Sequence, residues 1–514
     1  MRRAAILFLS TVLASAAWGQ GSITGTVLAP GGSGLAGCDL DFFDSVTGDE
    51  QTLVSGDLTG PGGVFLVTIP PGTYDMLVLP PLGTPILTKW VEGIVVASLT
   101  DLGTIPLDPG VFLSGTVSNF LNFPVGDADI DVEISATGES LTLQADKTAP
   151  TGSFQVVVPA TTIDVGIDPE GALGPTLSPV EIRGLGVCAD TDLGTISLGP
   201  GFFLTATVFG GFFPIEGADI DVKPAGGGPK LFTPGDNTDA TGFVDVVVPP
   251  GTYDVEVGAP LAAKRVAKVV PNVLVAGTTS VGPVFLESGF YLMGTVTGPA
   301  GQPIEKVDLD VEDEATGLDV ETPGDDTNAL GLYKVVVPAG TYTLDFDPAP
   351  LSPFESDDFS NVVVTGDATF DATLGATSCV GPAHYGAGTP GSGGAAPTIE
   401  TSNFARTGSS SFCLTVRSGL GGAFVVLAFG AAPASLPVLG GTLLVEPSFG
   451  FNTLHSILTG PSGAPCVGAR VFPLPIPNDP ALIGGTVYFQ AATIDTGAPQ
   501  DLALTDGLEV VVCD

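Results

Sequence analysis

Apolar and polar positions alternate along short stretches of this chain, and the stretches recur at a nearly constant interval. The clearest stretch places one apolar residue between two aspartates, at Asp39–Asp41, Asp129–Asp131, Asp219–Asp221 and Asp308–Asp310. Successive copies begin 90, 90 and 89 residues apart, from positions 39 to 129, 219 and 308. Alternation with a period of two predicts β-strands whose middle residue faces a core and whose aspartates face outwards.

Each copy carries further landmarks in the same order. A loop with the pattern Asp-x-Thr-x-x-x-Gly follows the aspartate strand, and a strongly apolar strand then ends at a proline. In three copies the turn after that proline reads Gly-Thr-Tyr, at 72–74, 251–253 and 340–342. A period near 90 residues is too long for a solenoid unit and suits a small β-sandwich of about seven strands.

The sequence therefore predicts an all-β protein with four tandem, seven-stranded-type β-sandwich repeats. Their predicted bounds are 21–109 (repeat 1), 110–199 (repeat 2), 200–287 (repeat 3) and 288–375 (repeat 4). Residues 376–514 have fewer acidic residues, more Ala and Gly, and four cysteines. Their apolar strand-like stretches predict a disulfide-containing C-terminal β-sandwich, called the C-terminal domain below.

The stretch 238–255 resembles a known family. It reads Thr-Asp-Ala-Thr-Gly-Phe-Val-Asp-Val-Val-Val-Pro-Pro-Gly-Thr-Tyr-Asp-Val, and this pattern is similar to the carboxypeptidase regulatory-like domain. That domain is a transthyretin-like β-sandwich, grouped with starch-binding-like folds and with the B-type repeats of bacterial collagen adhesins. The resemblance covers about residues 21–375. It implies an accessory or stalk module of a secreted bacterial protein and offers no catalytic residue to carry over.

Residues 1–19 predict a signal peptide, because a basic start precedes an apolar run that ends in small residues. A second apolar run, 418–445, is uncharged but is interrupted by prolines and glycine pairs, which break helices. It predicts two buried strands, at 423–429 and 441–445, joined by a Pro-rich turn. No transmembrane segment is expected after signal cleavage, and the protein is expected to be secreted or on the cell surface.

The formal net charge is −41, and nearly all of it lies in the four repeats. A field this negative disfavours nucleic acid and anionic membranes as partners. Six cysteines are compatible with an oxidising compartment. The four in the C-terminal domain can be paired in three ways. We expect the arrangement with Cys413–Cys466 and Cys379–Cys513. Cys38 and Cys188 are then left as a candidate link between the first two repeats.

The aspartate strand is the feature closest to a binding site. Its two carboxylates lie on one face about 7 Å apart, and the loop aspartate is expected nearby. Clusters of oxygen ligands suit Ca²⁺. The alternative, which we prefer, is a solvated polar face with a loop aspartate bonded to its own turn. The candidate calcium ligands, in repeats 3 and 4, are Asp219, Asp221, Asp236, Asp239, Asp308, Asp310, Asp325 and Asp326.

Three motifs have the letters of a functional site without its surroundings. Gly386–Gly391 fits G-x-G-x-x-G, but no clear strand precedes it and no helix follows, so it predicts a linker or turn. Asp495-Thr496-Gly497 is similar to an aspartic protease motif, yet the chain holds one copy where two carboxylates must meet. A catalytic triad would need His384 or His455, and neither lies near a nucleophile elbow.

The sequence thus favours a non-enzymatic protein with a structural or adhesive role, a rod of sandwiches that presents the C-terminal domain to an extracellular protein or polysaccharide. A first alternative is an array of carbohydrate-binding modules of the starch-binding-like fold. Aromatic platforms for sugars are sparse, however, since Trp90 is the one tryptophan left after signal cleavage. A second alternative is a hydrolase in the C-terminal domain. Ca²⁺ is the one cofactor considered.

Overall fold

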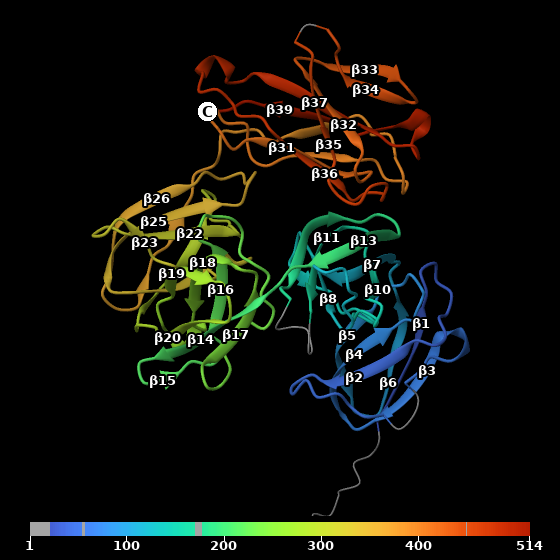
Figure 1. Cartoon of the computed structure of the whole chain (residues 1–514), viewed down its shortest axis with the longest axis vertical. Coiled ribbons are helices and arrows are strands. Elements are labelled where there is room, and N and C mark those ends of the chain that lie inside the picture. The colour runs from blue at the N-terminus through green and yellow to red at the C-terminus, as the bar shows by residue number, and fades with distance from the viewer. Residues whose placement is uncertain (1–20, 54–56, 170–176, 449) are drawn as a thin grey trace, which may run out of the picture. The chain divides into compact units, whose positions relative to one another are not determined.

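The computed structural model describes residues 21–53, 57–169, 177–448 and 450–514, and these residues form mainly β-strands (Figure 1). The predicted all-β fold is confirmed, whereas the predicted signal peptide lies outside the described residues. The chain forms two compact units. One holds the described residues up to Phe112 with Thr142–Gln144 and Val157–Pro159, and the other holds the remainder up to Asp514.

Repeat 1 consists of two three-stranded sheets that share one core. Its strands are β1 (Gly21–Leu28), β2 (Asp39–Asp44), β3 (Val64–Ile69), β4 (Gly72–Leu79), β5 (Lys89–Val96) and β6 (Leu99–Pro106), with the short 3₁₀ turn η1 (Pro61–Gly63) before β3. In one sheet β1 lies between antiparallel β3 and parallel β6, and in the other β4 lies between antiparallel β2 and β5. Side chains of all six strands meet in the core.

The same strand order recurs in the next three repeats. Repeat 2 has β7 (Val111–Asn119), β8 (Asp129–Ile134), β9 (Glu139–Ser140), β10 (Ser153–Val158), β11 (Thr162–Asp168), β12 (Val180–Gly186) and β13 (Thr191–Leu198). Repeat 3 has β14 (Phe202–Gly210), β15 (Phe213–Pro214), β16 (Asp219–Pro224), β17 (Phe243–Val248), β18 (Gly251–Gly258), η3 (Leu261–Ala263), β19 (Lys268–Val275) and β20 (Thr279–Phe285). Repeat 4 has β21 (Phe290–Thr297), β22 (Val307–Asp313), β23 (Leu318–Asp319), β24 (Leu332–Val337), β25 (Gly340–Pro348), β26 (Asp357–Val364), β27 (Ala368–Thr369) and β28 (Ala372–Thr373). Within the described residues, repeats 2, 3 and 4 each have a two-residue strand that repeat 1 lacks, namely β9, β15 and β23.

The alternation along the aspartate strands has the predicted effect. The middle residues Leu40, Ile130, Ile220 and Leu309 are at most 1% exposed. Hydrophobic side chains at this spacing fill one face of each sheet, and burying each stabilises the sandwich by about 1.5–3 kcal/mol. The aspartates on either side therefore stay on the outer face, where charge is best solvated.

Each linker is held by main-chain hydrogen bonds to the repeat that it leaves. In repeat 1 the Leu87 N–H donates to the Asp108 carbonyl at 3.0 Å, and the Gly110 N–H donates to the Pro85 carbonyl at 2.9 Å. Equivalent antiparallel bridges are Ile86–Pro109, Leu177–Pro200, Arg265–Ser288 and Phe354–Ala376. Strands β7, β14 and β21 begin two residues after the first three bridges. Each linker is therefore hydrogen-bonded to the repeat that precedes it.

The C-terminal domain contains β29 (Ala383–Tyr385), β30 (Thr398–Thr401), β31 (Cys413–Gly419), β32 (Phe424–Gly430), β33 (Pro433–Val438), β34 (Gly441–Val445), β35 (Asn452–Ile457), β36 (Gly468–Pro473), η4 (Pro480–Leu482), β37 (Thr486–Ile494), η5 (Pro499–Asp501), β38 (Leu502–Leu504) and β39 (Gly507–Val511). One sheet has the order β29-β39-β37-β32-β35, and another has the order β30-β31-β36. The predicted strands at 423–429 and 441–445 are present as β32 and β34, and the predicted turn between them contains a third strand, β33, which pairs with β34. Within the described residues, no helix has the length and apolar character needed to cross a membrane.

Candidate functional site

The threonine of the Asp-x-Thr loop is a structural residue in every repeat. The Thr238 hydroxyl donates to the Ile215 carbonyl at 2.7 Å and accepts from the Ala218 N–H at 2.8 Å. Thr238 is 3% exposed. The same two bonds form at Thr59, Thr148 and Thr327. This hydroxyl satisfies two buried main-chain groups, as buried polar groups require.

The tyrosine of the Gly-Thr-Tyr turn has an equally local role. The Tyr253 hydroxyl donates to the carbonyl of Pro249 at 2.8 Å, which closes the turn at the end of β17. Tyr74 and Tyr342 make the same bond to Pro70 and Pro338. The preceding glycine is required, since a Cβ at Gly251 would lie 2.6 Å from the Tyr253 hydroxyl. The tyrosine hydroxyl therefore stabilises the turn.

A third set of structural side chains was missed at the sequence level. The pairing of β18 with β19 shifts register between Tyr253 and Val255, and Asn272 has φ of 57° there. Its N–H donates to the Asp254 carboxylate at 2.7 Å. Gly93 and Gly184 occupy the same position in repeats 1 and 2, bonded to Asp75 and Asp164. The recurring Gly or Asn, residues that tolerate positive φ at a bulge, was the available signal.

In repeat 3 the loop aspartate does lie beside the aspartate strand. The Ile220 N–H donates to the Asp236 carbonyl at 3.1 Å. Burial, followed by the charges of Asp236 and Asp221, raises the pKa of Asp219. The Lys230 ammonium lies 2.9 Å from Asp221. That hydrogen bond is the main cause of the raised pKa of Lys230, with Asp219 and Asp236 adding to it. A lysine therefore supplies the positive charge at this cluster.

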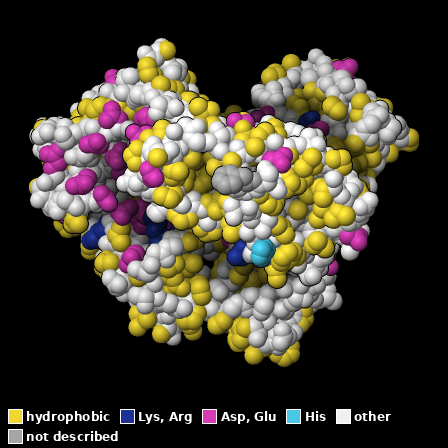
Figure 2. All heavy atoms as spheres, turned by 90° about the horizontal axis from the view of Figure 1, so that it is seen from above, with side chains coloured by type: hydrophobic (Ala, Val, Ile, Leu, Met, Phe, Trp, Pro, Cys, Tyr) yellow, Lys and Arg dark blue, Asp and Glu magenta, His cyan; other side chains and the backbone are white. Residues whose placement is uncertain are grey.

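Repeat 4 gathers more carboxylates. Asp308 pairs across the sheet with Asp347, and Asp310 pairs with Asp345. Burial raises the pKa of Asp325 to about 6, with the charges of Asp308 and Asp326 acting in the same direction. The Thr322 hydroxyl donates to Asp325 at 2.5 Å and opposes this shift. Figure 2 shows that acidic side chains are far more prominent than Lys and Arg on the face it presents.

The eight aspartates predicted as calcium ligands are only partly brought together. Asp239 accepts from the Thr241 N–H at 2.8 Å and the Phe243 N–H at 3.0 Å. It therefore bonds its own turn, and a hydrogen bond from the Thr241 hydroxyl is the main cause of its lowered pKa. In the part of the chain that the structure describes, no group of three or more His, Cys, Asp or Glu side chains is arranged to hold a metal ion. Calcium binding stays a prediction.

The motifs that resembled catalytic sites have structural contacts. Asp495 is 2% exposed and accepts hydrogen bonds from the N–H groups of Ser392 and Gly497 at 2.7 and 2.9 Å. It anchors the end of the glycine-rich segment that begins at Gly386. His384 lies 3.0 Å from Asp506 and is half-exposed. The Ser392 hydroxyl also donates to the Asp495 carboxylate, and together these contacts hold the loops in place.

One of the two predicted disulfides is present and the other is wrong. Cys379 bonds to Cys513, as expected for a bond that ties the ends of a domain. Cys466 bonds to Cys188 of repeat 2 and not to Cys413. Cys413 and Cys38 are both free thiols, so the candidate Cys38–Cys188 link is wrong as well. The four cysteines of the C-terminal domain do not all pair among themselves, because Cys466 bonds to a cysteine of repeat 2.

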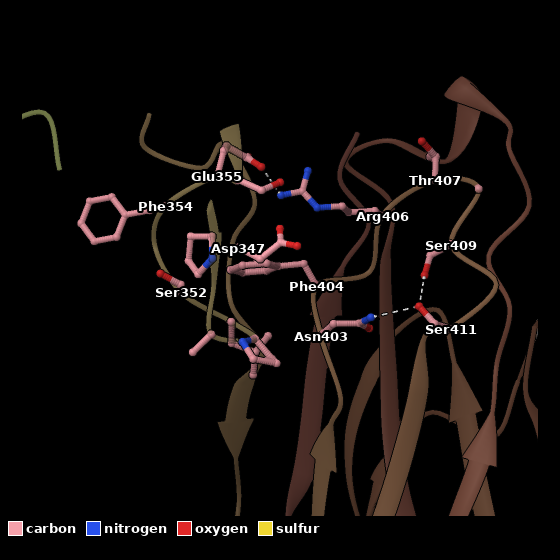
Figure 3. Close-up of a pocket in the computed structure, with 16 residues that line it drawn as sticks. Asp347, Ser352, Phe354, Glu355, Asn403, Phe404, Arg406, Thr407, Ser409 and Ser411 are labelled. Atoms are coloured by element: carbon pink, nitrogen blue, oxygen red, sulfur yellow. Dashed lines mark hydrogen bonds and ion pairs between the residues drawn. The ribbon is translucent and has the colours of Figure 1, made fainter. Parts of the chain in front are cut away.

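A cavity of about 560 Å³ lies between loop 347–356 of repeat 4 and segment 403–411 of the C-terminal domain (Figure 3). Its lining includes the hydroxyl or amide groups of Ser352, Asn403, Thr407, Ser409 and Ser411. The Phe404 ring points toward the loop of repeat 4, whereas Phe354 points away from the other labelled side chains (Figure 3). The polar groups can form hydrogen bonds with a neutral, hydroxyl-rich ligand, and the aromatic ring can stack against it.

Arg406 fixes one wall of this cavity. Its guanidinium donates to Glu355 at 2.5 Å, to the Asp514 carbonyl at 2.9 Å and to the Thr377 hydroxyl at 3.3 Å. The pKa of Glu355 is lowered, mainly by a hydrogen bond with Thr377 and also by Arg406. An arginine that donates to several groups from two segments gives orientation as well as attraction. The charge of Arg406 is thus neutralised within the protein.

Solved structures of three known proteins match parts of this chain at low sequence identity. No family model and no curated protein sequence matches it. The Bacillus anthracis TIE protein is 13% identical over 67% of this chain and 68% of its own, with a TM-score of 0.16. BcpA, the major pilin subunit of Bacillus cereus, is 11% identical over 70% and 100%, with a TM-score of 0.15. The shaft pilin SpaA from Lactobacillus rhamnosus GG is 10% identical over 35% and 98%, with a TM-score of 0.16.

Proposed function

We propose that this chain is a non-enzymatic, secreted or cell-surface protein with a structural or adhesive role, in which four sandwiches carry the C-terminal domain. The use of the repeated motif residues supports this most. The loop threonine, the turn tyrosine and the bulge aspartate each bond main-chain groups of their own repeat. Polar side chains committed in this way stabilise a fold and are not free to act on a ligand.

Two further features support the same proposal. Linkers hydrogen-bonded to the preceding repeat suit repeats that carry load or hold a domain away from a surface. Two disulfides within one chain are typical of an oxidising, extracellular compartment. We also propose that the repeats are relatives of the carboxypeptidase regulatory-like domain, on the pattern at 238–255, in which Thr238 and Tyr253 have structural roles.

Co-sedimentation with envelope material of the producing cell tests this function. The full-length mature chain is mixed with washed envelopes, either with about 2 mM Ca²⁺ or with a chelator. The ionic strength is about physiological, so that charges more than about 8 Å apart are largely screened. We expect the chain to pellet with the envelopes. If calcium organises the aspartate strands, retention and melting temperature both fall with the chelator. A chain that stays in the supernatant under both conditions contradicts the adhesive role.

Carbohydrate binding is the second candidate, and the cavity beside Phe404 is the observation that favours it. The probes are soluble neutral oligosaccharides, namely maltoheptaose, cellohexaose and xylohexaose, titrated calorimetrically into the full-length chain. We expect Phe404→Ala to weaken binding about tenfold, because a stacked ring contributes roughly 1 kcal/mol or more. Phe212→Ala is the matched control, because Phe212 is 97% exposed and does not line the cavity. No heat with any of the three sugars removes this candidate.

A further inference from the structure

The Cys188–Cys466 disulfide closes a large part of the chain into a covalent ring. The two cysteines are 278 residues apart in sequence, and their Cα atoms lie 5.8 Å apart. The ring therefore contains the whole of repeats 3 and 4, at 200–287 and 288–375. Cys379–Cys513, by contrast, spans 134 residues within and beside the C-terminal domain. The Cys188–Cys466 disulfide therefore joins the chain before repeat 3 to the chain after repeat 4.

Repeat 2 differs from the other repeats where this bond forms. Val95, Leu274 and Val363 hold equivalent positions in β5, β19 and β26, and all three are more than 60% exposed. Repeat 2 has Gly186 there, and a Cβ on it would lie 2.7 Å from the Cys466 carbonyl. A side chain of the kind found in the other repeats would thus prevent this approach. Repeat 2 is specialised to receive the segment that carries Cys466.

The C-terminal domain encloses the bond from the other side. Cys466 is 1% exposed and has φ of 63°. A Cβ on Gly393 would lie 2.9 Å from the Cys188 sulfur and 3.4 Å from the Cys466 sulfur. The neighbouring Ser392 is held by the buried Asp495 carboxylate. Gly393, two residues after the Gly386–Gly391 motif, is therefore packed onto the sulfur atoms, and a side chain at that position would clash with them.

We propose that the Cys188–Cys466 disulfide shields repeats 3 and 4 from tension applied along the chain. A load transmitted from residues before 188 to residues after 466 passes through the S–S bond, since that path is far shorter than the 278 residues of the ring. The two repeats can then stay folded while force passes around them. This rests on covalent connectivity and is independent of what the protein adheres to.

The bond also makes the shielding redox-dependent. It forms when two thiols exchange with an oxidised disulfide donor: one S–S bond forms, and the donor takes up two electrons and two protons to become two thiols. A dithiol reductant reverses this step and is itself oxidised to a disulfide. Reduction therefore transfers the load from the bond to repeats 3 and 4. Cys466 is buried and Gly393 packs against both sulfurs, which limits access by such a reductant.

Single-molecule stretching of the full-length mature chain, held at its two ends, tests the proposal. For the oxidised wild type we expect no lengthening steps from repeats 3 and 4. After incubation with dithiothreitol, two added steps appear, each about 30 nm, because each repeat holds about 88 residues and an extended residue spans about 3.4 Å. Two added steps with the oxidised chain, or none after complete reduction, overturn the proposal.

Two variants separate this bond from the other. Cys188→Ser combined with Cys466→Ser is expected to release both repeats without any reductant, since the remaining Cys379–Cys513 bond closes a segment that lies after repeats 3 and 4. Cys379→Ser combined with Cys513→Ser is the matched control, and it retains the shielding. Peptide mapping of the oxidised wild type under non-reducing conditions checks the bond itself. A Cys413–Cys466 peptide in place of Cys188–Cys466 overturns the proposal whether or not the variants fold.

Discussion

A single hydroxyl in each repeat holds a loop against a sandwich. Thr238 bonds Ile215 and Ala218, which lie 23 and 20 residues before it in the chain. Both main-chain groups are buried, and a buried group without a partner costs about 1–3 kcal/mol. The threonine therefore stabilises the loop that brings Asp236 beside the aspartate strand.

Thr238→Val is expected to lower the free energy of unfolding of repeat 3 by about 2 kcal/mol, because valine keeps the shape and removes both hydrogen bonds. Hydrogen exchange of the peptide covering 215–222 measures this locally, and the amides there should exchange faster. Thr238→Ser retains the hydroxyl and should recover most of the protection. Thr207→Val, on the outward face of β14, is the control and should leave exchange unchanged. Equal protection in Thr238→Val and the wild type would contradict this role.

Asp325 gives repeat 4 a pH dependence of defined sign. Burial raises its folded pKa from 3.8 to about 6, so the folded chain binds a proton more tightly than the unfolded chain. The stability that this proton confers is present in acid and is lost as pH rises from about 4 to about 6. Asp325→Asn removes the charge permanently and should stabilise repeat 4 at pH 7 by about 1 kcal/mol, allowing for solvent screening.

Thermal unfolding of the two chains at pH 4.5 and pH 7 measures this prediction. The gain in melting temperature from Asp325→Asn should be present at pH 7 and small at pH 4.5. Asp239→Asn is the comparison, because the lowered pKa of Asp239 gives stability that is present at pH 7 and lost in acid. It should not stabilise the chain at pH 7. An equal gain at both pH values for Asp325→Asn refutes the assigned pKa.

Part of the residue-level picture could be predicted from the sequence. A period of two correctly places Ile220 in the core, because alternation alone decides which face a side chain occupies. The role of Thr238 could not be predicted, because its two partners are distant in sequence and are main-chain groups that any residue carries. The counter-charge Lys230 was missed for the same reason: its contact with Asp221 depends on how the loop folds back.

At the scale of elements, each repeat bends one edge strand by a bulge. Asn272 in β19 has positive φ, and the Asp254 carboxylate holds its N–H at 2.7 Å. A bulge leaves one residue unpaired and twists the strand locally. The strand pattern and its proline stops were predictable, because hydrophobic periodicity and proline chemistry are local. The bulge was not predicted, since Gly93, Gly184 and Asn272 look like ordinary strand residues in isolation.

Asn272→Val is expected to destabilise repeat 3 by about 1–2 kcal/mol, because a β-branched residue is strained at positive φ. Asn272→Gly should be tolerated, since Gly93 and Gly184 occupy the same position in other repeats. Urea unfolding of the full-length chain, followed by exchange of the β18–β19 peptides, distinguishes the two. Equal stability of the valine and glycine variants would show that the backbone there is not held at positive φ.

At the scale of the whole molecule, the sequence does not determine which cysteines form disulfides with each other. Four cysteines in one domain favour pairing within that domain, and this predicts Cys413–Cys466. The observed partner of Cys466 comes from repeat 2, and Gly186 and Gly393 make room for it. Such glycines are indistinguishable in sequence from the many others in this chain. The ring around repeats 3 and 4 is therefore a property of the fold rather than of a motif.

We propose that the chain binds and bears load and does no chemistry. The most direct test incubates the full-length mature chain with washed envelopes of the producing cell and follows both the bound protein and any soluble fragments released. The account predicts that the chain is retained in the pellet and that fragments stay at the level of envelopes incubated alone. Release of sugars or peptides in proportion to added protein, with no lasting retention, would contradict it.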